Sequence, residues 1–409
     1  YYSTMNGCTL TLVFLLFFYV YAAPFSGCLL DTDKNLPKKN EPLFLIKDKG
    51  QSYSFILPRT KGKDGYIELK NGEELLMSCP GQNNYMVETK QKLNNAYCES
   101  GDKLSIKKKV FASENLECQE RVVAKINKTD EKCHSGKGTV LKIGFKTEGF
   151  WYPLVTVCHD IQGSHTFYST HTLHGAALLG KVHRTIGGRP GFSRGEKFLF
   201  KGFNPERTYT RNNQEKLFDT LLGKKKTAEY LDGKTKFLAR GHLAPDADFI
   251  FSTWQFATYF YINVAPQWQT INAGNWLQVE SNSRRIASKL RADVEVATGT
   301  NGVSKLLNYK GKEKEIYLEP KKKVPVPEYY WKLLRYPGND SCMGFIATNN
   351  PYLEKAPKHK CKDICKDFGW PVLQNDLTKG YVYCCDYGSI KKVIPEIPDF
   401  QCKNTLHFA

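Results

Sequence analysis

Residues 237–250 read Phe-Leu-Ala-Arg-Gly-His-Leu-Ala-Pro-Asp-Ala-Asp-Phe-Ile, and this stretch decides both the fold and the chemistry that we expect of the chain. In an extended strand, side chains two residues apart share a face, so Arg240 and His242 point the same way. An arginine for a phosphate oxygen, beside a histidine that is neutral near pH 7, suits the attack of water on a phosphodiester. We expect the small Gly241 between them to let a substrate backbone approach closely.

A second stretch, residues 263–280, reads Asn-Val-Ala-Pro-Gln-Trp-Gln-Thr-Ile-Asn-Ala-Gly-Asn-Trp-Leu-Gln-Val-Glu. A helix that begins near Asn272 brings Asn272, Trp276 and Glu280 close to one face. An amide oxygen is a hard, neutral ligand that suits Mg²⁺, and a carboxylate two turns further along can hold metal-bound water. The pattern predicts a divalent-metal site on this helix.

The two stretches together carry a resemblance. Arg-Gly-His-x-Ala-Pro, followed by Asn-x-x-Pro-Gln and Asn-x-Gly-x-Trp, resembles the DNA/RNA non-specific endonuclease family over roughly residues 145–402. The sequence is similar to secreted arthropod members, such as salivary or digestive nucleases. The resemblance implies an α+β fold with a ββα-metal (His-Me) finger and a mixed or antiparallel sheet. It also implies a sequence-non-specific endonuclease that hydrolyses DNA and RNA to products with 5′-phosphates.

The same resemblance implies roles for individual residues. His242 is expected to be the general base, and Asn272 is expected to bind the metal directly, Mg²⁺ or alternatively Mn²⁺. Glu280 would hold metal-bound water, and Arg240 would contact the scissile phosphate. Asn263 would hold the base and the active-site backbone in place.

Two positions around the motif leave alternatives open. A further family arginine lies about thirty residues upstream, where Arg211 fits best and Arg207 is the rival. The family usually has an aspartate before Arg-Gly-His, and Ala239 stands there instead, which removes a carboxylate near the phosphate-binding arginine. Asp246 and Asp248 could replace it as metal ligands, because Asp-x-Asp suits a hard cation, but we favour a role in capping and tethering the next loop.

Other chemistry-bearing residues are given a structural interpretation. The histidines that crowd one strand-like segment lack the glutamate and spacing of a zinc-protease helix, so we interpret them as core or surface residues. They are His159, His165, His171, His174 and His183. Residues 297–300 and 325–331 match strands that the family packs behind its active site.

The N-terminal sequence predicts export. The uncharged apolar run at residues 10–23 is shorter than the roughly 20 residues that span a bilayer, and it ends in Val-Tyr-Ala, which suits signal peptidase. We therefore expect a signal peptide at residues 1–22, with spurious residues before Met5, and no stable membrane insertion. Cleavage removes Cys8 and leaves 12 of the 13 cysteines, an even set typical of disulfides in a secreted protein. Sequons at Asn127 and Asn339 predict an extracellular glycoprotein.

The pattern of apolar and polar residues along the chain changes near residue 140. Residues 23–140 hold short alternating segments, such as 52–57 and 66–69, which predict a small β-rich module stapled by disulfides. Its five cysteines, at positions 28, 79, 98, 118 and 133, are an odd number, so one either bridges to the second domain or stays free. Residues 141–409 are expected to form the α+β nuclease domain.

The formal charge of +18 limits the possible partners. A strongly basic, folded protein favours polyanions, which here means DNA and RNA as substrates and other polyanions as further ligands. An alternative is therefore a catalytically silent protein that binds heparin, polyphosphate or a membrane surface. Three lysine runs, at 107–109, 224–226 and 321–323, are interpreted as solvated loops, with contact to a phosphate backbone as the alternative.

Overall fold

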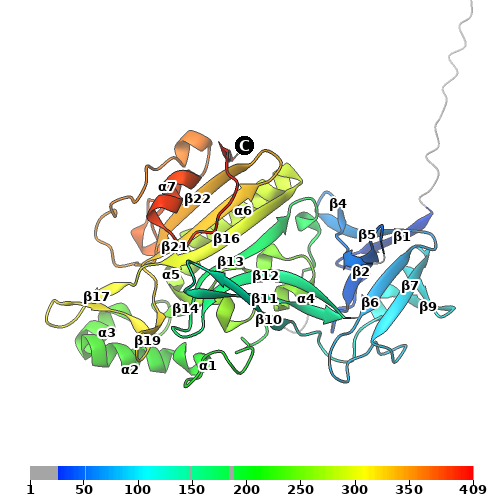
Figure 1. Ribbon diagram of the computed structural model, residues 1–409, viewed down its shortest axis with the longest axis horizontal. Coiled ribbons are helices and arrows are strands. Elements are labelled where there is room, and N and C mark those ends of the chain that lie inside the picture. The colour runs from blue at the N-terminus through cyan, green and yellow to red at the C-terminus, as the bar shows by residue number, and fades with distance from the viewer. Residues whose placement is uncertain (1–25, 51, 148, 184–187, 409) are drawn as a thin grey trace, which may run out of the picture.

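The computed structural model describes residues 26–50, 52–147, 149–183 and 188–408. The expected signal peptide, residues 1–22, lies outside these residues. Figure 1 shows three parts along the longest axis: a β-rich N-terminal module, a large central sheet, and a lobe of short helices and hairpins at the opposite end. The fold is α+β with mainly antiparallel sheets, which confirms the fold class predicted from the sequence.

The N-terminal module consists of two antiparallel sheets. The first has the order β1-β5-β4 and the second the order β3-β2-β6-β7-β8-β9. Their strands are β1 (Gly27–Asp31), β2 (Leu43–Lys47), β3 (Tyr53–Phe55), β4 (Arg59–Lys61), β5 (Asp64–Lys70), β6 (Glu74–Ser78), β7 (Leu93–Ser100), β8 (Lys103–Ile106) and β9 (Lys109–Ala112). Alternate residues of β5 are buried, which is the period that one apolar face requires. Disulfides Cys28–Cys98 and Cys79–Cys118 cross-link the module.

The module shares a hydrophobic core with the rest of the chain. The ring of Phe44 lies 5.4 Å from that of Phe251, and the ring of Phe55 lies 4.6 Å from that of Trp254. Glu41, which is buried, accepts hydrogen bonds from the backbone N–H and the hydroxyl of Thr253, each at 2.9 Å. The module is therefore packed firmly against the helix α4 (Ser252–Phe256).

The central sheet has nine strands in the order β10-β11-β12-β13-β16-β21-β22-β23, with β24 pairing in parallel to β22. They are β10 (Lys125–Cys133), β11 (Gly138–Thr147), β12 (Phe150–Asp160), β13 (His165–His174), β16 (Asp293–Asn301), β21 (Tyr329–Tyr336), β22 (Ser341–Thr348), β23 (Val382–Cys385) and β24 (Asn404–Thr405). Cys133, the fifth cysteine of the N-terminal set, pairs with Cys158 on β12. The odd cysteine thus forms a bridge across residue 140.

A two-stranded ladder and two helices lie against this sheet. Strand β14 (Leu238–His242) pairs with β15 (Val264–Trp268), and β15 leads into α5 (Gln269–Asn272) and α6 (Asn275–Leu290). The expected continuous helix is interrupted, because α5 ends at Asn272 and α6 begins only at Asn275. A side chain at Gly274 would meet the carbonyl oxygen of Thr270 at 2.3 Å, so the turn between the helices requires glycine.

The lobe at the far end comprises three helices and two hairpins. Its elements are α1 (Pro205–Thr208), α2 (Arg211–Leu222), α3 (Lys224–Tyr230), β17 (Lys305–Leu307), β18 (Glu313–Glu315), β19 (Tyr317–Glu319) and β20 (Lys323–Pro325). Backbone and side-chain hydrogen bonds, such as Tyr309 N–H to the Leu222 carbonyl at 2.9 Å, join the helices to the hairpins. Figure 1 shows these elements gathered at the lower left of the molecule.

The C-terminal segment is held by three disulfides, Cys342–Cys402, Cys361–Cys385 and Cys365–Cys384, and carries the helix α7 (Tyr387–Val393). Asp363 lies near Cys365 and Cys384 in a grouping that a metal could use, but the two sulfurs are bonded to each other. The 12 cysteines expected in the mature chain are thus all paired, as predicted. Within the described residues, no helix combines the length and the apolar character needed to cross a membrane.

Candidate active site

Strands β14 and β15 position the two residues of the Arg-Gly-His motif. In the antiparallel register, His242 lies opposite Val264 and Arg240 lies opposite Pro266. Because side chains alternate along a strand, Arg240 and His242 share one face, as the sequence predicts. Both residues are partly exposed, although Nε of Arg240 and Nε2 of His242 are themselves buried.

Gly241 faces the other way, toward the protein interior. A Cβ atom there would lie 2.5 Å from Oε1 of Gln267 and 2.7 Å from the hydroxyl of Tyr330. The expectation that this glycine makes room for a substrate backbone is therefore wrong, because the space is taken by the chain itself. Ala239 shares the inward face and lies opposite Gln267 in the register. A carboxylate at position 239 would lie beside the Gln267 amide, on the face away from the arginine side chain.

Three aromatic rings surround the guanidinium of Arg240. Its central carbon lies 5.4 Å from the centroids of Phe192 and Tyr209 and 5.6 Å from that of Tyr261. Such cation–π contacts hold the cation in place. Within the described residues, Arg240 Nε is buried and has no hydrogen-bond partner. This is the arrangement of an arginine prepared to bind an anion.

His242 lies beside Phe192, one of these three rings, and beside a fourth ring, that of Tyr259. Its imidazole centroid is 5.2 Å from that of Phe192 and 5.0 Å from that of Tyr259. The Tyr259 hydroxyl donates to Oδ2 of Asp246 at 2.7 Å. The rings fix the orientation of the imidazole, and Asp246 in turn fixes Tyr259.

Asn263 ties together the backbone that follows the histidine. Its Oδ1 accepts from the Ala244 N–H at 3.0 Å, and its Nδ2 donates to the Ala244 and Thr258 carbonyls at 2.9 and 3.0 Å. Its own carbonyl accepts from the Leu243 N–H at 2.9 Å. Because the side chain is fully buried and all these bonds are local to the motif, Asn263 suits the positioning role that the sequence predicts.

Asn272 ends α5 and is half-exposed. Its Nδ2 donates to Oε1 of Gln269 at 3.4 Å, which leaves the amide oxygen available as a ligand. Around it in the chain, buried polar atoms of Gln267, Thr270 and Trp276 have no hydrogen-bond partner within the described residues. The Asn272 amide oxygen is a hard donor of the kind that Mg²⁺ takes, and Mg²⁺ keeps most of its water molecules in proteins. The residues present therefore fit a metal of this kind.

Glu280 lies on α6 within a cluster of buried charges. Burial raises the pKa of its carboxyl to about 7, and the Lys332 ammonium on β21 opposes this rise. Lys332 is fully buried, and its Nζ donates to the Thr298 hydroxyl at 2.5 Å. A buried lysine is costly unless negative groups lie near it, so Lys332 and Glu280 stabilise each other.

Asp248 completes this cluster and is not free to bind a metal. Its two carboxylate oxygens accept from His171 Nε2 and from Arg284 Nη1, each at 2.8 Å. Burial would raise the pKa of Asp248, but the His171 hydrogen bond and the Arg284 charge hold it below its usual range. This geometry favours the tethering role over the metal-ligand role for Asp248.

The two candidates for the further arginine lie in the lobe. Arg211, at the start of α2, stacks on the ring of Phe237 at 4.2 Å and donates to the Gly233 carbonyl. Arg207 is exposed on α1. Among the described residues, neither makes a hydrogen bond or ring contact with Arg240 or His242. Their assignment stays a prediction.

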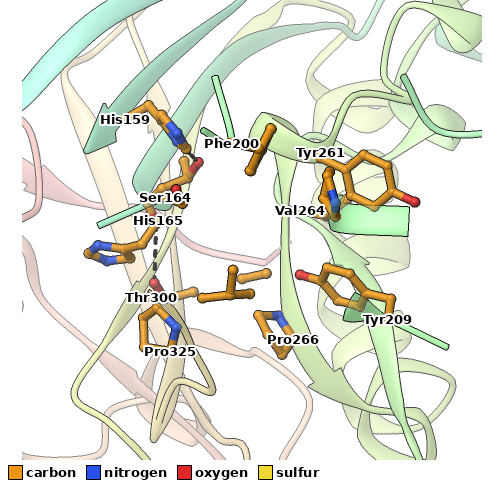
Figure 2. A pocket seen from close by; sticks show the side chains of 14 residues that line it. His159, Ser164, His165, Phe200, Tyr209, Tyr261, Val264, Pro266, Thr300 and Pro325 are labelled. Carbon is orange, nitrogen blue, oxygen red and sulfur yellow. Dashed lines mark hydrogen bonds between the residues drawn. The ribbon is translucent and has the colours of Figure 1, made fainter. Parts of the chain in front are cut away.

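A small cavity lies behind two of the rings that hold Arg240. In Figure 2, Tyr209, Tyr261, Val264 and Pro266 form one wall, and residues of the β12–β13 turn and of the segments around 300 and 325 face them. The cavity volume is about 20 Å³, which is room for one or two water molecules.

His159 and Ser164 turn buried polar atoms toward this region. The Thr166 hydroxyl donates to the Ile262 carbonyl, so it accepts from Nδ1 of His159 at 2.8 Å, and Nε2 of His159 is left as an acceptor. Burial lowers the pKa of His159 to about 3, so its ring stays neutral. A buried water molecule would satisfy Nε2 and the Ser164 hydroxyl, which have no partner in the described residues. His159 is a core residue in this arrangement.

The aromatic rings around the site were not predicted from the sequence. Tyr209 and Phe192 come from segments far from the motif, and Lys332 lies within a strand that reads as apolar. A glycine-rich loop with two arginines, residues 188–195, was the available signal for Phe192. No local signal distinguishes Tyr209 from any other core tyrosine.

Comparisons with known proteins agree with this geometry. A family model of DNA/RNA non-specific endonucleases matches residues 136–389. The chain is 31% identical over 364 residues to a salivary endonuclease of Lutzomyia longipalpis, covering 88% of this chain and 81% of that protein. It is 27% identical to the salivary protein Tsal1 of Glossina morsitans morsitans, covering 94% of each. A salivary endonuclease of Culex quinquefasciatus is 24% identical, covering 65% of this chain and 68% of its own length.

Proposed function

Because the chain belongs to the DNA/RNA non-specific endonuclease family, we propose that it is a secreted, divalent-metal-dependent endonuclease that hydrolyses DNA and RNA without sequence preference. The observation that carries the proposal is the shared face of β14, where Arg240 and His242 lie side by side. The products expected from the family resemblance carry 5′-phosphates.

His242 acts as the general base in this proposal. In its neutral form it accepts a proton from the water molecule that attacks phosphorus, while Arg240 stabilises the negative charge that develops on the phosphate oxygens. The buried Nε of Arg240 and the rings around its guanidinium support this role, because a positioned cation needs no reorganisation during the reaction. Asn263 holds the backbone between the base and the following loop.

Asn272 would hold the metal through its amide oxygen, and Glu280 would bind water molecules of the hydrated ion. Bound there, Mg²⁺ or Mn²⁺ supplies positive charge that stabilises the transition state and the departing oxygen. The ribose 2′-hydroxyl has no part in this scheme, which is why we expect both DNA and RNA to be substrates.

Export is supported independently of the active site. Six disulfides join the 12 cysteines from Cys28 to Cys402, a number typical of extracellular proteins. Two relatives described above are salivary endonucleases and a third is a salivary protein. Exposed asparagines at the sequons, Asn127 and Asn339, support glycosylation.

A catalytically silent polyanion-binding protein is the second candidate, and the charge of +18 favours it. The retained constellation of Arg240, His242, Asn272 and Glu280 favours the enzyme, because none of the four is needed to bind heparin or a membrane surface. The two candidates differ in one measurable property, which is turnover.

Nicking of supercoiled plasmid by the purified protein tests the proposal, with Mg²⁺, Mn²⁺ or Ca²⁺ and with EDTA. We expect cleavage that EDTA abolishes. His242→Ala should lower turnover by about 10²- to 10⁴-fold, the value of a positioned general base, and leave DNA affinity almost unchanged. A folded His242→Ala protein that nicks like the wild type would show that the assigned base is wrong. Tight binding by wild-type protein without any cleavage would favour the silent binder.

A further inference from the structure

The loop at residues 188–195 reads Gly-Arg-Pro-Gly-Phe-Ser-Arg-Gly and lies against the candidate active site. Arg189 and Arg194 are exposed and flank Phe192 on either side. Gly195 has a φ of +74°, which favours glycine and turns the chain after the second arginine. Cations that alternate with an aromatic side chain are typical of surfaces that bind single-stranded nucleic acid.

Backbone hydrogen bonds fix this loop next to the site. The Ser193 N–H donates to the Tyr259 carbonyl at 2.8 Å, and the Tyr261 N–H donates to the Ser193 carbonyl at 3.0 Å. The neighbouring Phe192 ring is therefore held 5.2 Å from the His242 ring and 5.4 Å from the Arg240 guanidinium. Backbone hydrogen bonds fix the position of the Phe192 ring, so the ring is a constant part of the site.

Phe192 differs from the other rings around Arg240 in its exposure. Tyr209 and Tyr261 are 7% and 4% exposed and serve as core residues. Phe192 is only half-buried, so part of its ring remains available to a ligand. An apolar surface beside a phosphate-binding arginine fits the one apolar part of a nucleotide, which is the face of its base.

We propose that Phe192 is a stacking platform for the base next to the scissile phosphate, and that Arg189 and Arg194 bind flanking phosphates. The proposal rests on the proposed function, because it takes Arg240 as the residue that binds the scissile phosphate. Arg189 lines a groove that reaches Asp246, the residue that fixes Tyr259. The loop thus offers a path for one strand past the catalytic base.

This arrangement has a consequence for the choice of substrate. A base can stack on Phe192 only after it leaves the stack of its own strand, which costs a few kcal/mol in a duplex and least in a single strand or at a mismatch. The substrate class favoured by the loop is therefore single-stranded or locally unpaired nucleic acid. Sequence preference is not expected, because every base has a face that can stack.

Equilibrium binding tests the platform without relying on turnover. The probe is a short single-stranded DNA carrying 2-aminopurine, compared with the same DNA as a duplex, and the protein is full-length His242→Ala so that the probe is not cut. Phe192→Leu is made in this background, with Phe192→Trp as the conservative variant. Phe150→Leu is the matched control, since Phe150 is 53% exposed on the distant β11–β12 hairpin. Circular dichroism establishes that each variant is folded.

We expect Phe192→Leu to weaken single-strand binding by roughly 5- to 150-fold, the value of stacking one base, and to abolish the quenching of 2-aminopurine. Duplex affinity should fall much less, Phe192→Trp should restore single-strand binding, and Phe150→Leu should change neither. Unchanged single-strand binding, or an equal loss for both probes, would overturn the platform. If wild-type protein cuts no nucleic acid but Phe192→Leu loses the single strand, the platform stands and the proposed hydrolysis fails.

Discussion

The N-terminal module and the region that follows it differ most in charge. Residues 1–124 carry 16 lysines and arginines against 14 aspartates and glutamates, whereas residues 125–409 carry 43 against 27. Almost the whole excess of positive charge therefore lies on the part that holds the candidate active site. A positive field concentrated in this way attracts polyanions to one part of the molecule and not to the other.

The two regions also differ in how well their buried polar atoms are satisfied. Among the described residues, Glu41 Oε1 is the module's single buried side-chain atom without a partner. The later region leaves several such atoms unpaired close to the site, on Arg240, Gln267, Thr270 and Trp276. An unpaired buried polar atom costs about 1–3 kcal/mol, so each such atom needs a partner such as a buried water molecule or a ligand. This difference agrees with a structural role for the module and with the proposal that the later region binds and cleaves nucleic acid.

Replacing Asn272, the proposed metal ligand, should give the largest effect and should affect activity alone. Asn272→Ala is expected to lower turnover by at least about 10²-fold at any Mg²⁺ concentration, because charge stabilisation by a metal is worth several kcal/mol. The free energy of unfolding should barely change, since the half-exposed side chain makes one long hydrogen bond. Initial rates across a Mg²⁺ titration, with urea denaturation beside them, measure both. Wild-type rates would remove Asn272 from the site.

Removing a disulfide of the module should have the opposite result, a loss of stability with unchanged activity. Cys28→Ser with Cys98→Ser opens a loop of 70 residues and should lower the free energy of unfolding by about 2–5 kcal/mol. Nuclease activity well below the melting temperature should be unchanged, because the described hydrogen bonds from the module to the later region end at residues such as Gly180, His183 and Thr253, outside β14. A folded variant that loses activity would show that the module contributes to catalysis, which would contradict the difference in role between the two regions.

The contact that Glu41 makes between the two regions can be tested by the pH dependence of the free energy of unfolding. Burial raises the pKa of its carboxyl to about 7, above the ordinary value of 4.5. Between these values the folded protein holds a proton that the unfolded chain releases. The contribution of Glu41 to stability therefore rises as the pH falls from about 7 toward 4.5, by about 1.4 kcal/mol per unit. Glu41→Gln should flatten this part of the stability profile, whereas Glu88→Gln, at an exposed position, should not.

Replacing a run of lysines with neutral residues should give the smallest effect. It tests whether the difference in charge between the two regions affects DNA binding. Lys224–Lys226 begin α3 in the lobe, whereas Lys107–Lys109 lie in the module at the turn from β8 to β9. Replacing the first run with alanine should reduce the salt dependence of DNA binding by up to about 0.9 per lost phosphate contact, and replacing the second should not. Binding isotherms from low to moderate salt measure the slope. Equal slopes for both variants would mean that the lobe binds no phosphate.

The sequence predicted the parts of this molecule that depend on local pattern. The extended pattern of residues 238–242 identified the shared face of Arg240 and His242, and the helical spacing after Asn272 identified the face of α6 that carries Trp276 and Glu280. The prediction from the sequence failed where the role of a residue depends on contacts with distant parts of the chain. Gly241 reads as an opening for substrate until Gln267 and Tyr330 are found against it.

The same limit applies to the loop beside the site. Phe192 reaches His242 only because Ser193 pairs with Phe260, 67 residues further along the chain. Nothing in the composition of residues 188–195 encodes that pairing. The sequence could therefore show a basic, aromatic loop but not where the fold would hold it.

The adjacent cysteines of β23 connect the disulfide pairing of the C-terminal segment to the register of the strand. Cys384 and Cys385 are neighbours on one strand, so they point to opposite faces of the sheet, and each belongs to a different hydrophobic cluster. Exchanging their partners, Cys365 and Cys361, would require the strand to slip by one residue and turn both faces over. Once β23 has paired with β22, the mispaired isomer is geometrically excluded. The register of β23 against β22 is therefore compatible with the observed pair of bridges and not with the exchanged pair.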